Sequence, residues 1–157
     1  MWFFILLLET LNLHHPTSEI MLLPAEIESK TLIPALRAIL AKKLAEEHDI
    51  REDEISKMLG VTQAAISNYI RGTRGDPSLI AKLLAEKQVS QLIDELCDHL
   101  SSDLAYTPSS LSKFIGLCNY IKSSLLICEI HHNLETNIDE KICKECENML
   151  LKGPGSV

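Results

Sequence analysis

The sequence predicts an all-α fold, and three observations indicate this class. Ala, Leu, Ile, Lys and Glu dominate the 157 residues, and a composition of this kind favours helices. Glycine and proline number six each, and strongly β-branched runs are scarce. Apolar residues recur at helical spacing through most of the chain. Because aromatic residues make up only 4% of the sequence, the core is expected to consist mainly of Leu and Ile.

The first 20 residues form a leader that fits neither a membrane anchor nor a signal peptide. The apolar run from Trp2 to Leu8 has seven residues, whereas a membrane-spanning helix needs about 20. No basic residue precedes this run, and no small-residue cleavage site follows it. We therefore expect residues 1–20 to be a loosely attached tail or an upstream extension with the true start at Met21.

Six helices are expected after the leader: Thr31–His48, Glu52–Leu59, Gln63–Arg71, Ser78–Leu100, one from Ser109 or Ser110 to about Asn133, and Asp139–Leu151. Pro34 suits the first turn of the first helix, where a missing N–H is tolerated. Gly60 and Gly72 are expected to end the second and third helices, and Thr62 to cap the third. This pattern predicts a domain over residues 21–100 and a helical, cysteine-containing region over 101–157.

Residues 52–71 carry the signature of two helices that cross around a short turn. The turn needs a residue that tolerates positive φ, which Gly60 supplies, and the close helix approach needs a small side chain, which Ser56 supplies. Apolar residues fall where a tripod core requires them, at Ile55, Leu59, Val61, Ile66 and Tyr69. We interpret this segment as a helix-turn-helix.

The outer face of helix 63–71 has the chemistry of a major-groove reader, because it is small and polar and contains no carboxylate. The amides of Gln63 and Asn68 can bond adenine, the Ala64 methyl can pack on thymine, and Ser67 can donate or accept. Basic and hydroxyl side chains at the helix end suit phosphates. The predicted DNA-contacting residues are Thr62, Gln63, Ala64, Ser67, Asn68, Arg71, Thr73 and Arg74.

The net charge of −7 argues against nucleic-acid binding at first, but the charge is unevenly distributed. Residues 77–157 carry −4 and the leader −2, whereas Ile55–Gly75 carries three basic residues and no acidic ones. The sequence shows no Gly-rich phosphate loop, nucleophile elbow or supported carboxylate pair, so we do not expect an enzyme.

Two segments resemble a known family: Leu32–Ala41 and Gly60–Gly72. The second is similar to the DNA-binding domains of the xenobiotic-response-element (XRE), Cro and phage-repressor type. Together they resemble a group of archaeal regulators whose longer members add a thiamine-phosphate-synthase-like domain, for which this chain is too short. The resemblance implies a lambda-repressor-like fold of five helices. One departure concerns a family Gln that contacts phosphate: Arg51 and Glu52 stand there instead, which predicts modest, salt-sensitive affinity.

Five cysteines lie in the last 61 residues, and four positions have the spacing of a structural zinc site: Cys128, His131, Cys143 and Cys146. With Cys118 in place of the histidine, an iron–sulfur cluster is conceivable. A third interpretation is a redox switch in which Cys143 and Cys146 form a disulfide. The alternative is that Cys97, Cys118 and Cys128 are small buried apolar side chains.

These observations predict a cytoplasmic, sequence-specific transcriptional regulator that binds double-stranded DNA, does not enter the membrane and carries no certain cofactor. The odd cysteine count favours reduced thiols. One reading helix covers too few bases for genomic specificity, so we expect a homodimer formed through the Leu-rich helices after Pro77. The open alternatives are a metal-binding adaptor for another protein and an antitoxin-like repressor.

Overall fold

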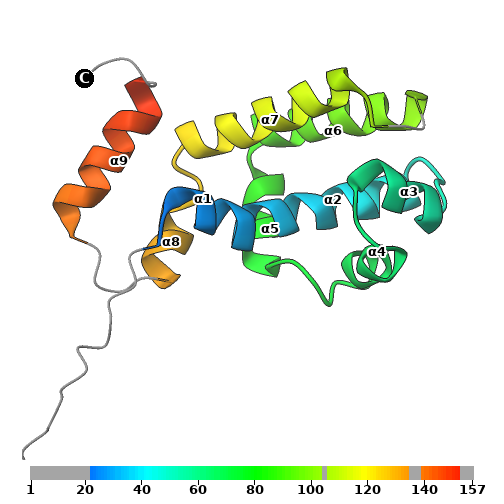
Figure 1. The fold of residues 1–157 in the computed structure, drawn as a ribbon, viewed down its shortest axis with the longest axis horizontal. Coiled ribbons are helices and arrows are strands. Elements are labelled where there is room, and N and C mark those ends of the chain that lie inside the picture. Colours follow the sequence, from blue (N-terminus) through cyan, green and yellow to red (C-terminus); the bar gives the residue numbers. More distant parts are fainter. Residues whose placement is uncertain (1–21, 104–105, 135–138, 153–157) are drawn as a thin grey trace, which may run out of the picture.

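A computed structural model describes residues 22–103, 106–134 and 139–152, so the predictions on residues 1–20 lie outside it. The described residues form helices and connecting turns, without a strand (Figure 1). The helices are α1 (Pro24–Ile27), the π-helix η1 (Glu28–Leu32), α2 (Ile33–Glu46), α3 (Glu52–Leu59), α4 (Gln63–Ile70), α5 (Pro77–Ala85), α6 (Lys87–Asp103), α7 (Pro108–Ser123), α8 (Cys128–Leu134) and α9 (Glu140–Lys152). This confirms the all-α class. None of the described helices is both long and apolar enough to cross a membrane.

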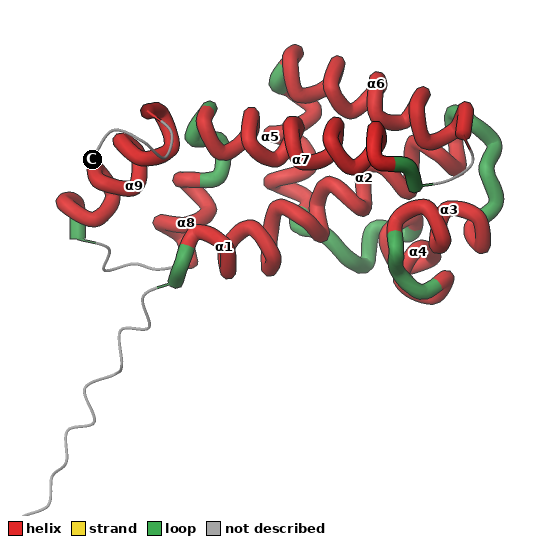
Figure 2. The backbone as a smooth tube through the Cα atoms, turned by 45° about the horizontal axis from the view of Figure 1, so that its top comes forward, coloured by secondary structure: helices red, strands yellow, loops and turns green. Residues whose placement is uncertain are grey.

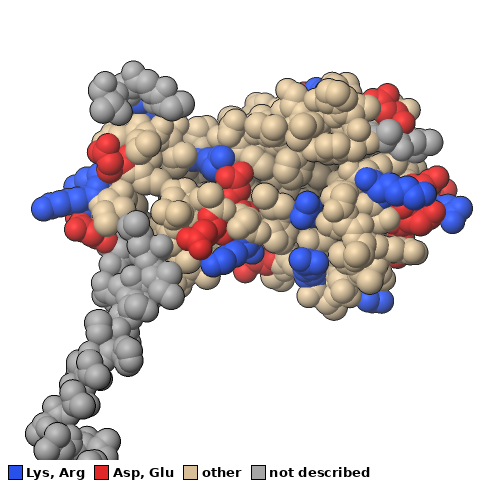
Figure 3. Space-filling view, in the orientation of Figure 1, with Lys and Arg blue, Asp and Glu red and all other residues tan. Residues whose placement is uncertain are grey.

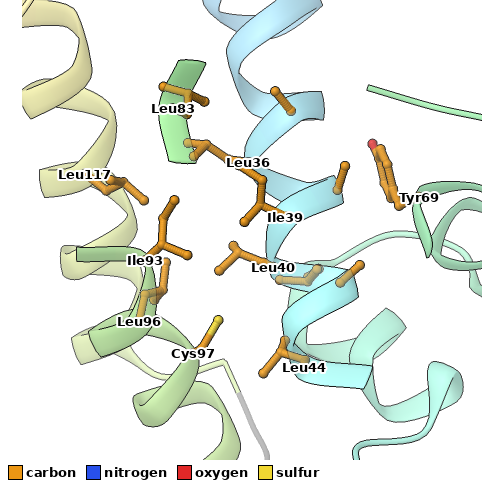
Figure 4. Packing of buried hydrophobic residues seen from close by; sticks show 14 of the residues in the cluster. Leu36, Ile39, Leu40, Leu44, Tyr69, Leu83, Ile93, Leu96, Cys97 and Leu117 are labelled. Atoms are coloured by element: carbon orange, nitrogen blue, oxygen red, sulfur yellow. The ribbon is translucent and has the colours of Figure 1, made fainter. Parts of the chain in front are cut away.

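Helix α2 is the central element, with α3, α4, α5 and α6 all packed against it. Its side chains Leu36, Leu40 and Leu44 are fully buried (Figure 4). The prediction that this helix begins at Thr31 was wrong. Helical backbone begins at Pro24 and passes through η1 into α2, because Ile27 is buried as well and anchors the earlier turns to the core.

The single helix predicted over Ser78–Leu100 is two helices, α5 and α6, separated by extended backbone at Glu86. Asp76 caps α5 by accepting a hydrogen bond from the Leu79 amide at 2.7 Å. In a straight helix, six residues at about 100° each would place Leu83 and Val89 on different faces. Both are fully buried. The break therefore lets the two halves of the segment turn their apolar faces to the same core.

A similar break divides the helix predicted from Ser109 or Ser110 to Asn133. Helix α7 is capped by Thr107, whose hydroxyl accepts from the Ser110 amide, and it ends at Ser123. Leu125 then adopts a φ of 58°, and α8 begins at Cys128. Ile121 and Ile127, again six residues apart, are both buried on the two sides of this break. The prediction of one continuous helix was wrong because burial of both residues requires the change of direction.

One hydrophobic cluster extends from Leu32 to Ile127 and crosses the boundary predicted near residue 100. Helices α6 and α7 lie side by side (Figure 2), and Leu117 of α7 joins Ile93 and Leu96 of α6 in the interior (Figure 4). Ion pairs connect distant segments at the rim of this cluster: Lys43–Asp94 at 2.9 Å, Lys122–Glu28 at 2.9 Å and Lys82–Glu129 at 2.6 Å.

The last helix, α9, lies at the opposite end of the molecule from α4 (Figure 1). It spans Glu140–Lys152, close to the predicted Asp139–Leu151, and the Asp139 carboxylate accepts from the Lys141 amide at 2.8 Å. Its packing partner is α7, and it contains no buried residue. The apolar side chains of Ile142, Met149 and Leu151 are about half exposed or more.

Candidate nucleic-acid interface

The turn between α3 and α4 has the backbone geometry that the sequence predicts. Gly60 adopts a φ of 62°, in the left-handed region that glycine reaches without steric cost. The next amide, of Val61, donates to the Ser56 carbonyl at 3.1 Å and closes the end of α3. The Thr62 hydroxyl accepts from the Ala65 amide at 3.2 Å. The predicted roles of Gly60 and Thr62 are thereby confirmed.

Burial divides α4 into two faces as the helical rotation predicts. Ala65, Ile66 and Tyr69 are buried against the core. Gln63 and Ala64 are exposed and Ser67 and Asn68 partly exposed, so the outward face is available to a partner. Of the expected tripod residues outside α4, Ile55 and Leu59 are buried, whereas Val61 is only partly so.

At the end of α4, Asn68 forms hydrogen bonds with two of the residues predicted to contact phosphates. Its side-chain oxygen accepts from Arg71 Nη2 at 2.8 Å, and its backbone carbonyl accepts from the Thr73 hydroxyl at 3.1 Å. Bidentate bonding to adenine needs the same amide oxygen as an acceptor. The Arg71 hydrogen bond uses one of the two lone pairs of this oxygen, so Asn68 is held by Arg71 at the atom that such bonding would use.

Arg74 lies over the ring of Tyr69, with its Cζ atom 5.1 Å from the ring centroid. This is within the range of a cation–π interaction, which holds the guanidinium on the outer side of a buried aromatic side chain. Sequence reasoning placed Tyr69 in the core and Arg74 on phosphate without relating them. Their five-residue separation crosses the end of α4, so helical spacing gave no signal of the contact.

Residues 42–86 match a protein-family model described as helix-turn-helix. The chain contains a helix-turn-helix domain. The matched residues run from the second half of α2 through α3, α4 and α5, and they end where α6 begins. The search of curated proteins and the search of solved structures each found no significant match.

The electrostatics of the helix-turn-helix domain are locally favourable to an anion. Lys57, Arg71 and Arg74 are exposed, and Figure 3 shows basic side chains over the α3–α4 end of the molecule, next to acidic side chains at its edge, where α3 begins with Glu52, Asp53 and Glu54. Arg51, directly before α3, pairs with Asp53, its Nε atom 3.1 Å from the carboxylate. Because this pair is on the surface, its energy is small, and Arg51 remains able to exchange Asp53 for a phosphate.

The residues predicted to hold a metal ion lie in the cysteine region, outside the helix-turn-helix domain. Among residues 22–103, 106–134 and 139–152, no three His, Cys, Asp or Glu side chains are placed to hold a metal ion. Cys143 Sγ lies 3.3 Å from Nε2 of His132, the residue that follows the predicted ligand His131 in α8.

All five cysteines are free thiols, and they fall into two groups. Cys97 and Cys118 are buried, and desolvation raises their pKa to about 12 and about 11. This environment agrees with their interpretation as small apolar core residues. Cys128 and Cys146 are partly buried, and burial again raises the pKa of both thiols. Neighbouring Cys143 and Cys146 raise the pKa of Cys128 further, which places these thiols near one another.

Proposed function

We propose that the protein is a cytoplasmic, sequence-specific transcriptional regulator, related to the archaeal XRE-type regulators, whose α4 enters the major groove of double-stranded DNA. The observation that carries this proposal is the outward face of α4. It presents amide, hydroxyl and methyl groups without a carboxylate, inside a helix-turn-helix domain. A non-enzymatic, DNA-binding role is typical of that domain type.

Within this proposal, residues divide into those that read bases and those that position the domain. Gln63, Ala64, Ser67 and Asn68 face the base edges, with the methyl of Ala64 against thymine. Thr62, Arg71, Thr73 and Arg74 lie at the two ends of α4, where the DNA backbone passes, and contact phosphates. The Arg71–Asn68 hydrogen bond links the two groups, because it holds a phosphate-contacting side chain next to a base-reading one.

We further propose that the regulator acts as a homodimer. One α4 reads only a few base pairs, and two copies one helical turn apart supply the missing specificity. The exposed apolar side chains Leu111 and Ile115 of α7, together with Met149 of α9, support a contact through the helices after Pro77, away from α4. Light scattering should then give twice the chain mass, and a monomer at operator-binding concentrations would contradict the dimer.

DNA binding is tested by fluorescence anisotropy with a labelled random duplex at increasing salt. The wild type should bind at low salt, and Arg71→Ala with Arg74→Ala should lower the slope of log affinity against log salt by about two. The control is Lys144→Ala with Lys152→Ala, which removes the same charge from exposed positions on α9. Wild-type protein without salt-dependent binding, or equal losses in the two double variants, would overturn the proposal.

A further inference from the structure

A cleft of about 600 Å³ lies behind α4, between α2, the α4–α5 connection and α5. Its volume falls in the range of sites that hold small molecules. The walls are mainly apolar and include Ile39 of α2, Ile70 of α4 and Ile80 and Leu84 of α5. Leu84 is 40% exposed, so an occupant would cover apolar surface that now faces solvent.

The cleft also contains a buried hydroxyl without a partner. Tyr69 lines it and is only 2% exposed, and its OH group has no hydrogen-bond partner among the described residues. Figure 4 shows the ring leaving α4 with its hydroxyl end directed toward α2. A buried, unsatisfied hydroxyl is costly, and native structures almost always satisfy such groups. Tyr69 therefore has a free donor for a ligand that carries an acceptor.

The rim of the cleft carries charge of both signs, with Glu46 and Glu47 on the α2 side and Arg74 across from α2 on the α4–α5 connection. Arg74, whose guanidinium lies over the Tyr69 ring, and Lys42 of α2 both line it. Lys43 is already paired with Glu47 and Asp94. The chemistry of an occupant follows from these neighbours: an apolar body against the isoleucines, an acceptor at Tyr69 and an anionic group near Arg74.

We propose that this cleft binds a small amphiphilic anion, such as an aromatic carboxylate or sulfonate. Tyr69 donates a hydrogen bond to the ligand, and Arg74 pairs with its charge. Gly75, at a φ of 95°, keeps the α4–α5 connection close to α2, because a Cβ there would lie 3.1 Å from Ala38 Cβ. The side of the cleft that carries Arg74 is thus fixed in position relative to α2.

Arg74 is common to the cleft and to the surface that faces DNA in the proposed function. A ligand anion and a DNA phosphate compete for one guanidinium, so ligand binding lowers DNA affinity. This consequence rests on the proposed function, whereas ligand binding itself does not. The two can therefore fail independently.

The binding site is tested on the full chain without DNA, with anilinonaphthalene sulfonate as a fluorescent probe and phenylnaphthylamine as its uncharged analogue. The wild type should bind the sulfonate saturably and more tightly than the amine. Ala81→Trp, which fills the cleft from an exposed position on α5, should weaken the sulfonate by about tenfold or more. Ala25→Trp, at an exposed alanine outside the cleft, should bind as the wild type does.

Tyr69→Phe removes the hydroxyl and retains the ring. It should weaken the sulfonate by about fivefold, the effect of one net hydrogen bond, without lowering the melting temperature. Equal binding by wild type, Ala81→Trp and Tyr69→Phe, or equal affinity for the two probes, would overturn the proposal. In a separate anisotropy titration, saturating sulfonate should lower wild-type DNA affinity, and unchanged affinity would overturn the coupling alone.

Discussion

The two ends of the molecule differ in how their helices use apolar side chains. In α2, seven of the 14 residues are buried, and four other helices surround them. In α9, a helix of 13 residues, no residue is buried, and its neighbours are α7 and, through Cys143 and His132, α8. Apolar residues at helical spacing therefore identify a helix at both ends, but only the surrounding helices decide whether those side chains become core.

The largest contrast between the two ends is expected in thiol chemistry. Only the thiolate reacts with iodoacetamide, and each unit of raised pKa lowers its fraction tenfold. At pH 8 the Cys97 thiolate, with a pKa of about 12 against the ordinary 9.0, should be about a thousandfold scarcer than that of an unperturbed thiol. Cys118, with a pKa of about 11, should also have a much lower thiolate fraction than an unperturbed thiol, although not as low as that of Cys97. Peptide mass spectrometry after timed labelling measures each site.

The partly exposed Cys143 should be labelled first in the folded protein. Denatured protein serves as the control, because all five cysteines should then react at similar rates. Equal labelling rates of Cys97 and Cys143 in the folded protein would show that Cys97 of α6 is not buried. The expected difference in thiol reactivity between the two ends of the molecule would then be wrong.

Replacing one leucine by alanine in α2 and one in α9 compares how much the two helices contribute to the free energy of unfolding. Leu40 is fully buried in α2, so Leu40→Ala should lower that free energy by about 3 kcal/mol through lost burial and an internal cavity. Leu151 in α9 is 59% exposed, and Leu151→Ala should change it by less than about 0.5 kcal/mol. Urea denaturation followed by circular dichroism measures both. A comparable loss in the two variants would mean that α9 is part of the cooperative core.

Local requirements made the helix-turn-helix predictable from the sequence. The bounds Glu52–Leu59 were correct, and the turn needed one residue with positive φ, which only Gly60 in that segment accepts freely. Thr62 lies directly before its helix, and its role as a cap depends on neighbours within three residues. Signals of this kind do not depend on how distant helices pack.

The features that the sequence did not reveal depend on contacts between distant residues. The breaks at Glu86 and Leu125 follow from which apolar residues share one core, and a helical repeat alone continues through both. The occupation of the Asn68 amide by Arg71 and the stacking of Arg74 on Tyr69 need the three-dimensional path of the chain after α4. The predicted metal ligands depend on the same kind of contact, since spacing places ligands along a chain and not around an ion.

Gly75 and Gly116 differ in the space around them, and an alanine substitution at each position tests that difference. Gly75→Ala should destabilise the protein by about 1–3 kcal/mol, because its φ of 95° disfavours a side chain and the new Cβ would lie 3.1 Å from Ala38 Cβ. Gly116 lies within α7, and a Cβ there has nothing within 4 Å. Gly116→Ala should therefore stabilise by about 0.5–1 kcal/mol. Thermal denaturation distinguishes the signs, and two variants that shift in the same direction would contradict the described packing.

A further comparison concerns two threonine caps, one in each region. Thr62 caps α4 and Thr107 caps α7, each by accepting an amide hydrogen bond at 3.2 Å. Thr62→Ala and Thr107→Ala should each lower the free energy of unfolding by about 1 kcal/mol, and serine at either position should restore it. Only Thr62→Ala should also weaken DNA binding, because α4 carries the proposed reading face. Equal DNA affinity in the two alanine variants would show that α4 does not contact DNA. A loss confined to Thr62→Ala would indicate that the start of α4 contacts DNA.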